Sequence, residues 1–250
     1  MGWADYHLHV MIPSADNPTI LWGDPEHAGI RLLLLPLLLT GYLLGYYLLR
    51  VLLNALTPES DFITLISCVG GLPLGLGFSY AGESLLKRFW RSRRALVLDG
   101  ETIQLQVNLQ TARRLQTRRN LDLLCWSFPL DAYPRGGRER RAPRRWLCLA
   151  CQLRQGDERL IAFTFAAPEA AAELMAAGDF RAIDPADVYD TSLSGRMTQP
   201  TVRPTIPSEV LAGKDGKFWV AERYRWQEGI ELIPADLGTL LAYVRQAQAT

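Results

Sequence analysis

The sequence is poor in the residues and motifs that carry catalysis. Its 250 residues include three histidines, and they contain no P-loop, no HExxH zinc motif and no GxSxG nucleophile elbow. The stretch most like the last motif, from Gly77 to Gly82, has the wrong spacing and lies in an apolar run. The enzyme classes that these motifs mark are therefore excluded. We expect a non-enzymatic protein that needs no cofactor.

Metal ligands are also scarce. His7 and His9 have the alternate spacing that places two imidazoles on one face of a strand, and Asp5 or His27 could complete a site. The ordinary alternative is a polar N-terminal segment whose histidines are hydrogen-bonded or solvated, and we favour it. His7 and His9 therefore stay weak metal candidates.

Cysteine is too rare to indicate a secreted disulfide scaffold, because the chain has four. Cys148 and Cys151 have CxxC spacing, but the surrounding pattern predicts a strand. Residues three apart on a strand point to opposite faces, so they cannot easily share a metal. We expect structural cysteines.

Charged residues are missing from two long stretches, 32–49 and 62–82. Each is long enough for a helix to cross about 30 Å of hydrocarbon. A cleavable signal peptide fits poorly, because about thirty residues without a basic n-region precede the first stretch. We therefore predict an irregular N-terminal segment over residues 1–29 and a transmembrane hairpin over 30–86, with helices over about 31–55 and 62–85.

Basic residues indicate how this hairpin is inserted. Cytoplasmic loops are enriched in Lys and Arg, and the short linker between the predicted helices has neither. Arg50 disagrees mildly, but its long side chain can reach the interface. We expect two spans in the inner (plasma) membrane with both termini cytoplasmic. The seam over residues 87–94 contains five basic residues: Lys87, Arg88, Arg91, Arg93 and Arg94.

Small residues recur at four-residue spacing in both predicted helices, at Gly41 and Gly45 and at Gly71 and Gly75. Such faces allow close approach of helix backbones in lipid. We predict that these four glycines are helix-packing positions. The partner is either the other helix of the hairpin or another subunit.

After Arg94 the apolar period changes from helical to two, which predicts a β-rich cytoplasmic domain over residues 95–250. Asp99-Gly100 is a hairpin-turn signal between the first two strands. A short helix over 168–177 and an amphipathic helix from Pro234 are also expected, whereas the proline-containing insertion 178–216 has no clear period. The expected strands are about 95–98, 103–107, 123–133, 147–153, 161–165, 218–226 and 230–233.

Seven short strands in meander order and a final helix, placed after a two-helix hairpin, resemble bacterial membrane proteins with a pleckstrin-homology-like (PH-like) domain. The stretches that carry the resemblance are RALVLDGETIQLQV, CWSFPLDAY and WLCLACQLRQGDERLIAFTF. It covers about residues 30–170 and 217–248. The resemblance implies a membrane α-helical hairpin followed by a mainly-β (α+β) barrel of two sheets with the C-terminal helix over one open end. It also implies a scaffold or lipid/protein-binding role. The insertion over residues 178–216 departs from the pattern of these proteins, and it affects the number of strands expected and the closure of the barrel.

The net charge of +1 conceals a basic region. Residues 87–145 hold fifteen Lys/Arg against five Asp/Glu, a net of +10, and they include two expected basic loops over 111–119 and 135–145. Near an anionic leaflet each basic residue contributes on the order of 1 kcal/mol; the alternative is simple solvation. Nucleic acid is not expected, because residues 146–250 are acidic and no binding motif appears. The candidate lipid- or partner-binding residues are the five of the seam and Arg113, Arg114, Arg118, Arg119, Arg138, Arg140, Arg141, Arg144 and Arg145.

Two functions fit these patterns. The first is a membrane-anchored binding or scaffold protein whose PH-like domain is held against the inner leaflet to bind anionic lipid or a membrane partner. The second is an accessory or assembly subunit of a multi-subunit membrane complex, with the hairpin packed on partner helices. The expected partners are anionic lipid headgroups and other membrane protein subunits.

Overall fold

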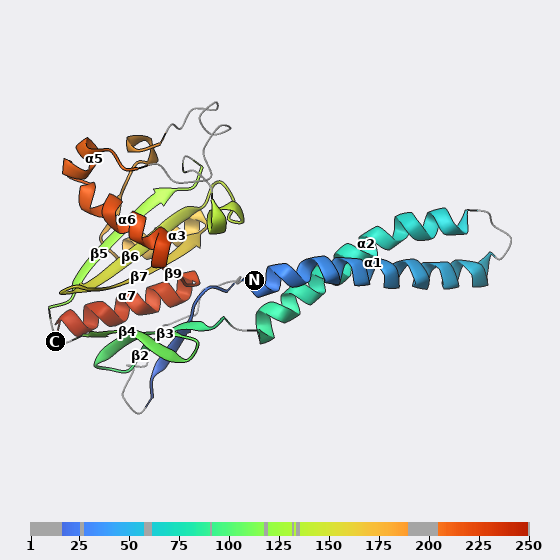
Figure 1. Ribbon diagram of the computed structural model, residues 1–250, viewed down its shortest axis with the longest axis horizontal. Helices are drawn as coiled ribbons and strands as arrows, with labels where there is room; N and C mark the ends of the chain where they lie inside the picture. The colour runs from blue at the N-terminus through green and yellow to red at the C-terminus, as the bar shows by residue number, and fades with distance from the viewer. Residues whose placement is uncertain are drawn as a thin grey trace. The chain divides into compact units, whose positions relative to one another are not determined.

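The computed structural model contains two long helices and a globular unit of mixed sheets and helices, an α+β arrangement (Figure 1). It describes residues 17–25, 28–57, 62–90, 92–117, 120–131, 133, 136–189 and 205–249. The hairpin unit is Asp24–Ser92, and the globular unit combines Met1–Gly23 with Arg93–Thr250. The weak metal candidates His7 and His9 lie outside the described residues.

The hairpin unit consists of α1 (Ala28–Leu56) and α2 (Ile63–Phe89). Both helices are long and apolar enough to span a membrane, as the charge-free stretches predict. At the end of α2, Lys87 Nζ lies 2.7 Å from Glu83 Oε1. Residues four apart share one side of a helix, so this ion pair follows from their spacing.

The four predicted packing glycines lie between α1 and α2. A Cβ added at Gly41, Gly45, Gly71 or Gly75 would come within 2.7–3.2 Å of an atom of the other helix. At Gly75 that atom belongs to backbone, because the added Cβ would be 3.0 Å from Tyr42 N. The helix backbones therefore approach closely at these glycines, and this approach occurs within the hairpin.

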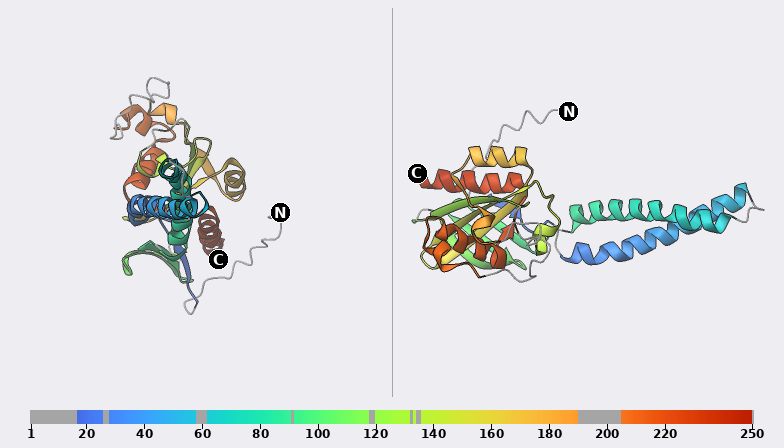
Figure 2. Two further views of the ribbon diagram at one scale, coloured as in Figure 1. Left: turned by 90° about the vertical axis from the view of Figure 1, so that its right-hand side faces the viewer. Right: turned by 90° about the horizontal axis from the view of Figure 1, so that it is seen from above.

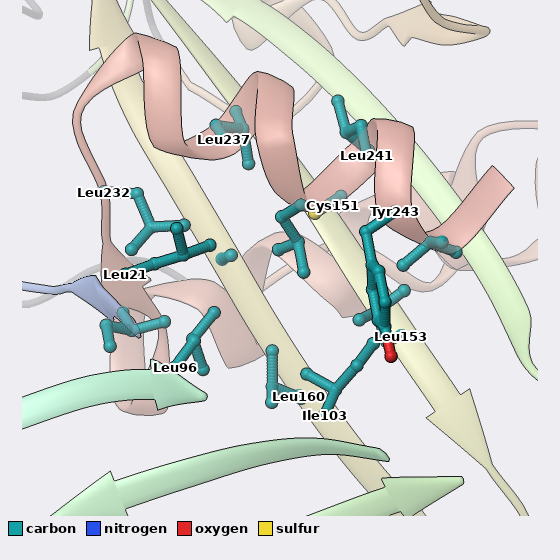
Figure 3. Packing of buried hydrophobic residues seen from close by; sticks show 14 of the residues in the cluster. Leu21, Leu96, Ile103, Cys151, Leu153, Leu160, Leu232, Leu237, Leu241 and Tyr243 are labelled. Atoms are coloured by element: carbon teal, nitrogen blue, oxygen red, sulfur yellow. The ribbon is translucent and has the colours of Figure 1, made fainter. Parts of the chain in front are cut away.

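The segment before the hairpin contains a strand that the sequence interpretation missed. β1 (Thr19–Trp22) pairs antiparallel with β2 (Arg94–Leu98), so the prediction of an irregular segment is wrong over these residues. Leu21 is 3% exposed and lies beside Leu96 and Leu232 in the core (Figure 3). The hairpin unit is thus inserted between two neighbouring strands of one sheet.

The first sheet has the order β1-β2-β3-β4, with β3 over Thr102–Val107 and β4 over Gln110–Gln116. The predicted turn between β2 and β3 is confirmed, and Gly100 has a φ of 89°. The expected basic loop over 111–119 is mostly strand β4, which corrects that prediction. Leu115 holds this strand in place because its side chain is fully buried in the core.

The second sheet has the order β8-β5-β6-β7-β9, with an antiparallel centre and a parallel strand at each edge. The predicted third strand ends at Pro129, short of residue 133, because proline cannot donate to a ladder. Cys148 and Cys151 lie on opposite faces of the sheet, in two different core clusters, as predicted. The strands are β5 (Asp122–Pro129), β6 (Leu147–Gln155), β7 (Glu158–Ala166), β8 (Phe180–Ala182) and β9 (Ile230–Glu231).

The strand predicted over residues 218–226 is wrong, because this segment is the helix α6 (Gly216–Glu228). Val220 and Trp226, which made the strand pattern, are 39% and 37% exposed. The pattern failed because the alternation assigns Trp219 and Arg225 to solvent, whereas α6 buries both of them together with Glu222. The buried face of α6 consists of Gly216, Phe218, Trp219, Ala221, Glu222 and Arg225, at helical spacing.

The insertion predicted over residues 178–216 contains regular structure. Besides β8 it includes the short helices η2 (Pro185–Asp187) and α5 (Ser208–Ala212). Residues 190–204 lie outside the described part of the chain. The predicted short helix before the insertion is confirmed as α3 (Pro168–Ala176).

The C-terminal helix α7 (Pro234–Ala249) lies between the two sheets (Figure 1). Leu237 and Leu241 of α7 enter the main core, which takes side chains from both sheets (Figure 3). α3 runs beside α7 (Figure 2). α6 covers the opposite face of the second sheet, where Trp126 and Trp219 are fully buried. The second sheet is therefore covered on both faces.

The two sheets do not close into the predicted barrel. In the described part of the chain, side chains bridge the seam between β4 and the β6–β7 hairpin where a closed barrel would have a backbone ladder. Gln155 Nε2 donates to Gln116 O and Gln155 Oε1 accepts from Gln116 N, both at 2.9 Å. Arg113 Nη1 donates to Arg159 O at 2.7 Å. The parallel strands β8 and β9 take the edge positions of the second sheet, so β4 does not continue its ladder.

Candidate functional site: the arginine end of the globular unit

Five arginines surround the connection between α6 and β9, and we call them the arginine cluster. They come from β2, β4, β7, the short helix η1 (Gly137–Arg140) and its C-cap residue Arg141. Four were among the predicted lipid- or partner-binding residues, whereas Arg159 was not. The cluster consists of Arg94, Arg113, Arg138, Arg141 and Arg159.

Two members of the arginine cluster bind backbone carbonyls at the end of α6. Arg94 donates from Nη2 to Glu228 O at 2.9 Å and from Nη1 to Gly229 O at 3.2 Å. Arg138 Nη1 donates to the same Gly229 O at 3.2 Å. The last carbonyls of a helix have no partner within the helix and form the negative end of its dipole. Guanidinium groups therefore stabilise this end of α6.

The other three members bind carboxylates. Glu228 accepts from Arg113 Nη2 at 2.7 Å and from Arg159 Nε at 2.5 Å. Arg141 forms an ion pair with Glu231. Burial acts to raise the pKa of Glu228, but the hydrogen bonds from Arg113 and Arg159 hold that pKa below its usual value. The cluster thus ties β4 of the first sheet to the end of α6 and to the second sheet.

The predicted binding residues fall into three groups: those engaged inside the globular unit, those outside the described part of the chain, and those exposed to solvent. Arg94, Arg113, Arg138 and Arg141 are engaged inside the globular unit, which the sequence interpretation missed. Arg91, Arg118, Arg119 and the side chain of Arg140 lie outside the described part. The residues exposed to solvent are Lys87, which is also paired with Glu83, and Arg88, Arg93, Arg114, Arg144 and Arg145.

Within the globular unit, the arginine cluster lies near Gly23 and Arg93, the residues that flank the hairpin unit in sequence. Gly23 N, just after β1, donates to Arg94 O at 2.9 Å, and Asn108 N, in the β3–β4 turn, donates to Arg93 O at 2.8 Å. Arg94 in turn contacts Gly229. The end of β1, the start of β2, the β3–β4 turn and the α6–β9 connection therefore share one end of the globular unit, which we call the arginine end.

A second group of charged residues is buried under α6. Arg225 lies 2.8 Å from Glu139 and 2.7 Å from Glu222, and Trp126 Nε1 and Tyr133 Oη donate to Glu222 at 3.0 and 2.6 Å. The three charged residues are at most 2% exposed. Burial raises the pKa of Glu139, and Arg225 acts against this rise. Because solvent and solutes do not reach this group, we assign it a structural role.

The remaining hollows and thiols do not form a catalytic arrangement in the described residues. Two open hollows of about 700 and 750 Å³ are lined in part by Asp122, and the first also touches Cys125 and Arg245. Burial raises the pKa of Cys125 to about 12, so its thiol is not a nucleophile at neutral pH. Among the described residues no group of three His, Cys, Asp or Glu side chains is arranged to hold a metal.

Comparisons of the chain with protein-family models, with curated proteins and with solved structures find no match. The function is therefore inferred from the sequence pattern, the hairpin unit and the arginine end.

Proposed function

We propose that this chain is a membrane-anchored, non-enzymatic binding or scaffold protein. Its globular unit, of the PH-like kind, is held against the inner leaflet of the plasma membrane. There, exposed basic residues bind anionic lipid or a membrane partner. The observation that carries the proposal is the insertion of an apolar helical hairpin between the paired strands β1 and β2.

The pairing of β1 with β2 supports the two-span topology. The two strands flank the hairpin in sequence, yet they are hydrogen-bonded to each other and must share one compartment. Two spans satisfy this condition, whereas a single span would separate the paired strands. The basic residues that follow α2 favour the cytoplasm as that compartment.

Short connections support a position of the globular unit close to the bilayer. Residues 90–93 join α2 to β2, and residues 23–27 join β1 to α1. At about 3.5 Å per residue, each connection reaches less than about 20 Å. Arg93, Arg144 and Arg145 are exposed, and each would contribute on the order of 1 kcal/mol near an anionic surface. Salt would weaken this attraction.

The arrangement of α7 between two sheets supports the PH-like proposal, while α6 and the open seam between the sheets depart from it. The alternative of an accessory subunit stays a prediction with weaker support. Its packing argument used Gly41, Gly45, Gly71 and Gly75, which pack within the hairpin itself. We therefore rank lipid binding first.

A hairpin-replaced variant tests lipid binding directly. In this variant a short Gly/Ser turn joins Gly23 to Arg93, which is feasible because Gly23 N is hydrogen-bonded to Arg94 O. A fragment beginning at residue 88 would be unsuitable, because it lacks β1. After circular dichroism establishes that the variant folds, flotation is compared for neutral phosphatidylcholine liposomes and for liposomes that also contain phosphatidylglycerol. We expect binding to the anionic liposomes, weakened by salt.

Two double variants with the same charge change locate the binding surface. Arg144→Gln with Arg145→Gln removes two exposed charges next to η1, and Arg154→Gln with Arg223→Gln removes two exposed charges elsewhere. At on the order of 1 kcal/mol per charge, the first pair should weaken binding to anionic liposomes roughly 30-fold. The second pair should change it little. Equal binding to neutral and anionic liposomes, or an equal loss in both double variants, would refute the proposal.

A further inference from the structure

The turn between β3 and β4 carries a leucine in an unfavourable backbone conformation. Asn108 and Leu109 have φ angles of 54° and 66°, as a two-residue type I′ turn requires. Asparagine and glycine adopt this left-handed region most easily, whereas a leucine Cβ crowds the following carbonyl. Leu109 is also 85% exposed, the largest exposed fraction among the described large apolar side chains. Packing within the globular unit therefore does not account for a leucine at this position.

The residues around the turn have a composition suited to the headgroup region of a bilayer, where water gives way to hydrocarbon. The chain has no charged residue from Thr102 to Ala112. Gln110 and Thr111, next to the turn, are exposed and uncharged. Removing uncharged polar groups from water costs far less than removing charges. The turn can therefore bring an apolar tip into the headgroup region at small cost in desolvation.

The turn belongs to the arginine end. Asn108 N donates to Arg93 O at 2.8 Å, and Val107 is opposite Arg94 in the register of β2 and β3. Arg93 is the fourth residue after Phe89, the last residue of α2. Four residues reach at most about 14 Å. If α2 crosses a bilayer, only a few residues therefore separate the end of that span from Arg93, which is hydrogen-bonded to the turn.

We propose that Leu109, at the tip of the β3–β4 turn, inserts into the interfacial region of the bilayer that the hairpin crosses. This inference rests on the proposed membrane anchoring and adds an apolar contact to the electrostatic one. The occupant is a lipid surface, because the turn adjoins the connection to α2 and the neighbouring exposed Arg93 matches anionic headgroups. Burying the leucine in lipid would offset its unfavourable conformation and its exposure.

The test uses the full chain in nanodiscs of phosphatidylcholine and phosphatidylglycerol. Cys125, Cys148 and Cys151 are buried, so a Cys68→Ser background leaves an added thiol as the reactive one. Leu109→Cys is labelled with an environment-sensitive fluorophore. Glu101→Cys is the matched control, because it lies in the turn at the other end of β3, roughly 20 Å away. The unmodified Cys68→Ser protein should take up no label, and equal melting temperatures of the two variants establish that both fold.

Lipids that carry a nitroxide in the headgroup or high in the acyl chain then report the depth of each label. We expect the label at position 109 to show blue-shifted emission and loss of intensity with both lipids, and the label at 101 to show neither. Equal responses at the two positions overturn the inference. If the response at 109 is absent while the Arg144/Arg145 double variant still loses anionic binding, the insertion of Leu109 alone is wrong. If that double variant also binds like its parent, the proposed lipid function fails as well.

Discussion

Strand β1 offers the sharpest test of the fold, because of two neighbouring residues on it one is buried in the core and the other is exposed. Leu21 is 3% exposed and belongs to the main core, whereas Ile20 is 48% exposed. Leu21→Ala removes buried methyl groups and leaves a cavity, which in protein cores costs about 2–5 kcal/mol. Ile20→Ala changes a residue that is largely in water and should stay within about 0.5 kcal/mol. Both substitutions replace a branched aliphatic side chain with alanine on the same strand, so the difference between them reports mainly the burial of Leu21.

The measurement is thermal and urea unfolding of the hairpin-replaced variant, followed by tryptophan fluorescence and circular dichroism. The globular unit has roughly 180 residues, for which 1 kcal/mol shifts the melting temperature by about 2–4 °C. A loss of about 3 kcal/mol in Leu21→Ala therefore predicts a melting temperature lower by about 6–12 °C. The dependence of the unfolding free energy on urea should keep its slope if the same surface unfolds.

The reasoning is refuted if Leu21→Ala and Ile20→Ala lower the melting temperature by the same small amount. That result would mean that residues before the hairpin do not enter the core. The insertion of the hairpin between β1 and β2 would then be wrong, and with it the main support for the two-span topology.

Three further perturbations test the buried charges and the hairpin. Burial raises the pKa of Glu139. At pH values between the ordinary glutamate pKa and the raised one, the folded chain therefore holds a proton that the unfolded chain releases. The contribution of Glu139 to the stability of the fold falls as pH rises through that window. Glu139→Gln should remove this fall, and parallel profiles of melting temperature against pH for the two proteins would contradict it. Arg225→Met should cost about 3–5 kcal/mol in urea unfolding, because it leaves two buried carboxylates without their cation; a loss below about 1 kcal/mol would count against this role. In the full chain in mild detergent, Gly75→Leu should lower the melting temperature by displacing the backbone of Tyr42. Gly77→Leu should leave the melting temperature unchanged, because a Cβ at this position meets no atom within 4 Å. Equal changes in melting temperature for the two variants would show that the contact at Gly75 is unimportant.

Several elements could be predicted from local pattern alone. The charge-free stretches predict α1 and α2 because a helix in lipid satisfies its own backbone hydrogen bonds and needs only apolar side chains. The apolar positions of α7 and the alternation in β6 and β7 predict those elements correctly, because one stripe or face of each is buried. The opposite faces of Cys148 and Cys151 follow from the same geometry.

The partners of the arginines could be identified only from the tertiary structure. Their density between residues 87 and 145 is visible in the sequence, but their partners Glu228, Gly229 and Glu231 lie about 90–135 residues further along the chain. A basic loop that is solvated and one that binds a distant helix end have the same local composition. Only the packing of α6 against the second sheet brings these carbonyls and carboxylates to Arg94, Arg113 and their neighbours.

Taken by itself, the sequence determined the two apolar helices, the basic region that follows them and the alternating strands of the globular unit, because each depends on residues that are close together in the chain. The tertiary structure decided three other features. It made β1 part of a sheet across the inserted hairpin, it made residues 216–228 a helix whose buried face carries Glu222 and Arg225, and it left the sheets open with Gln155 bridging their seam. Each of these depends on partners far away in sequence, because a charge can be buried and a short strand can be held only when distant groups supply the hydrogen bonds.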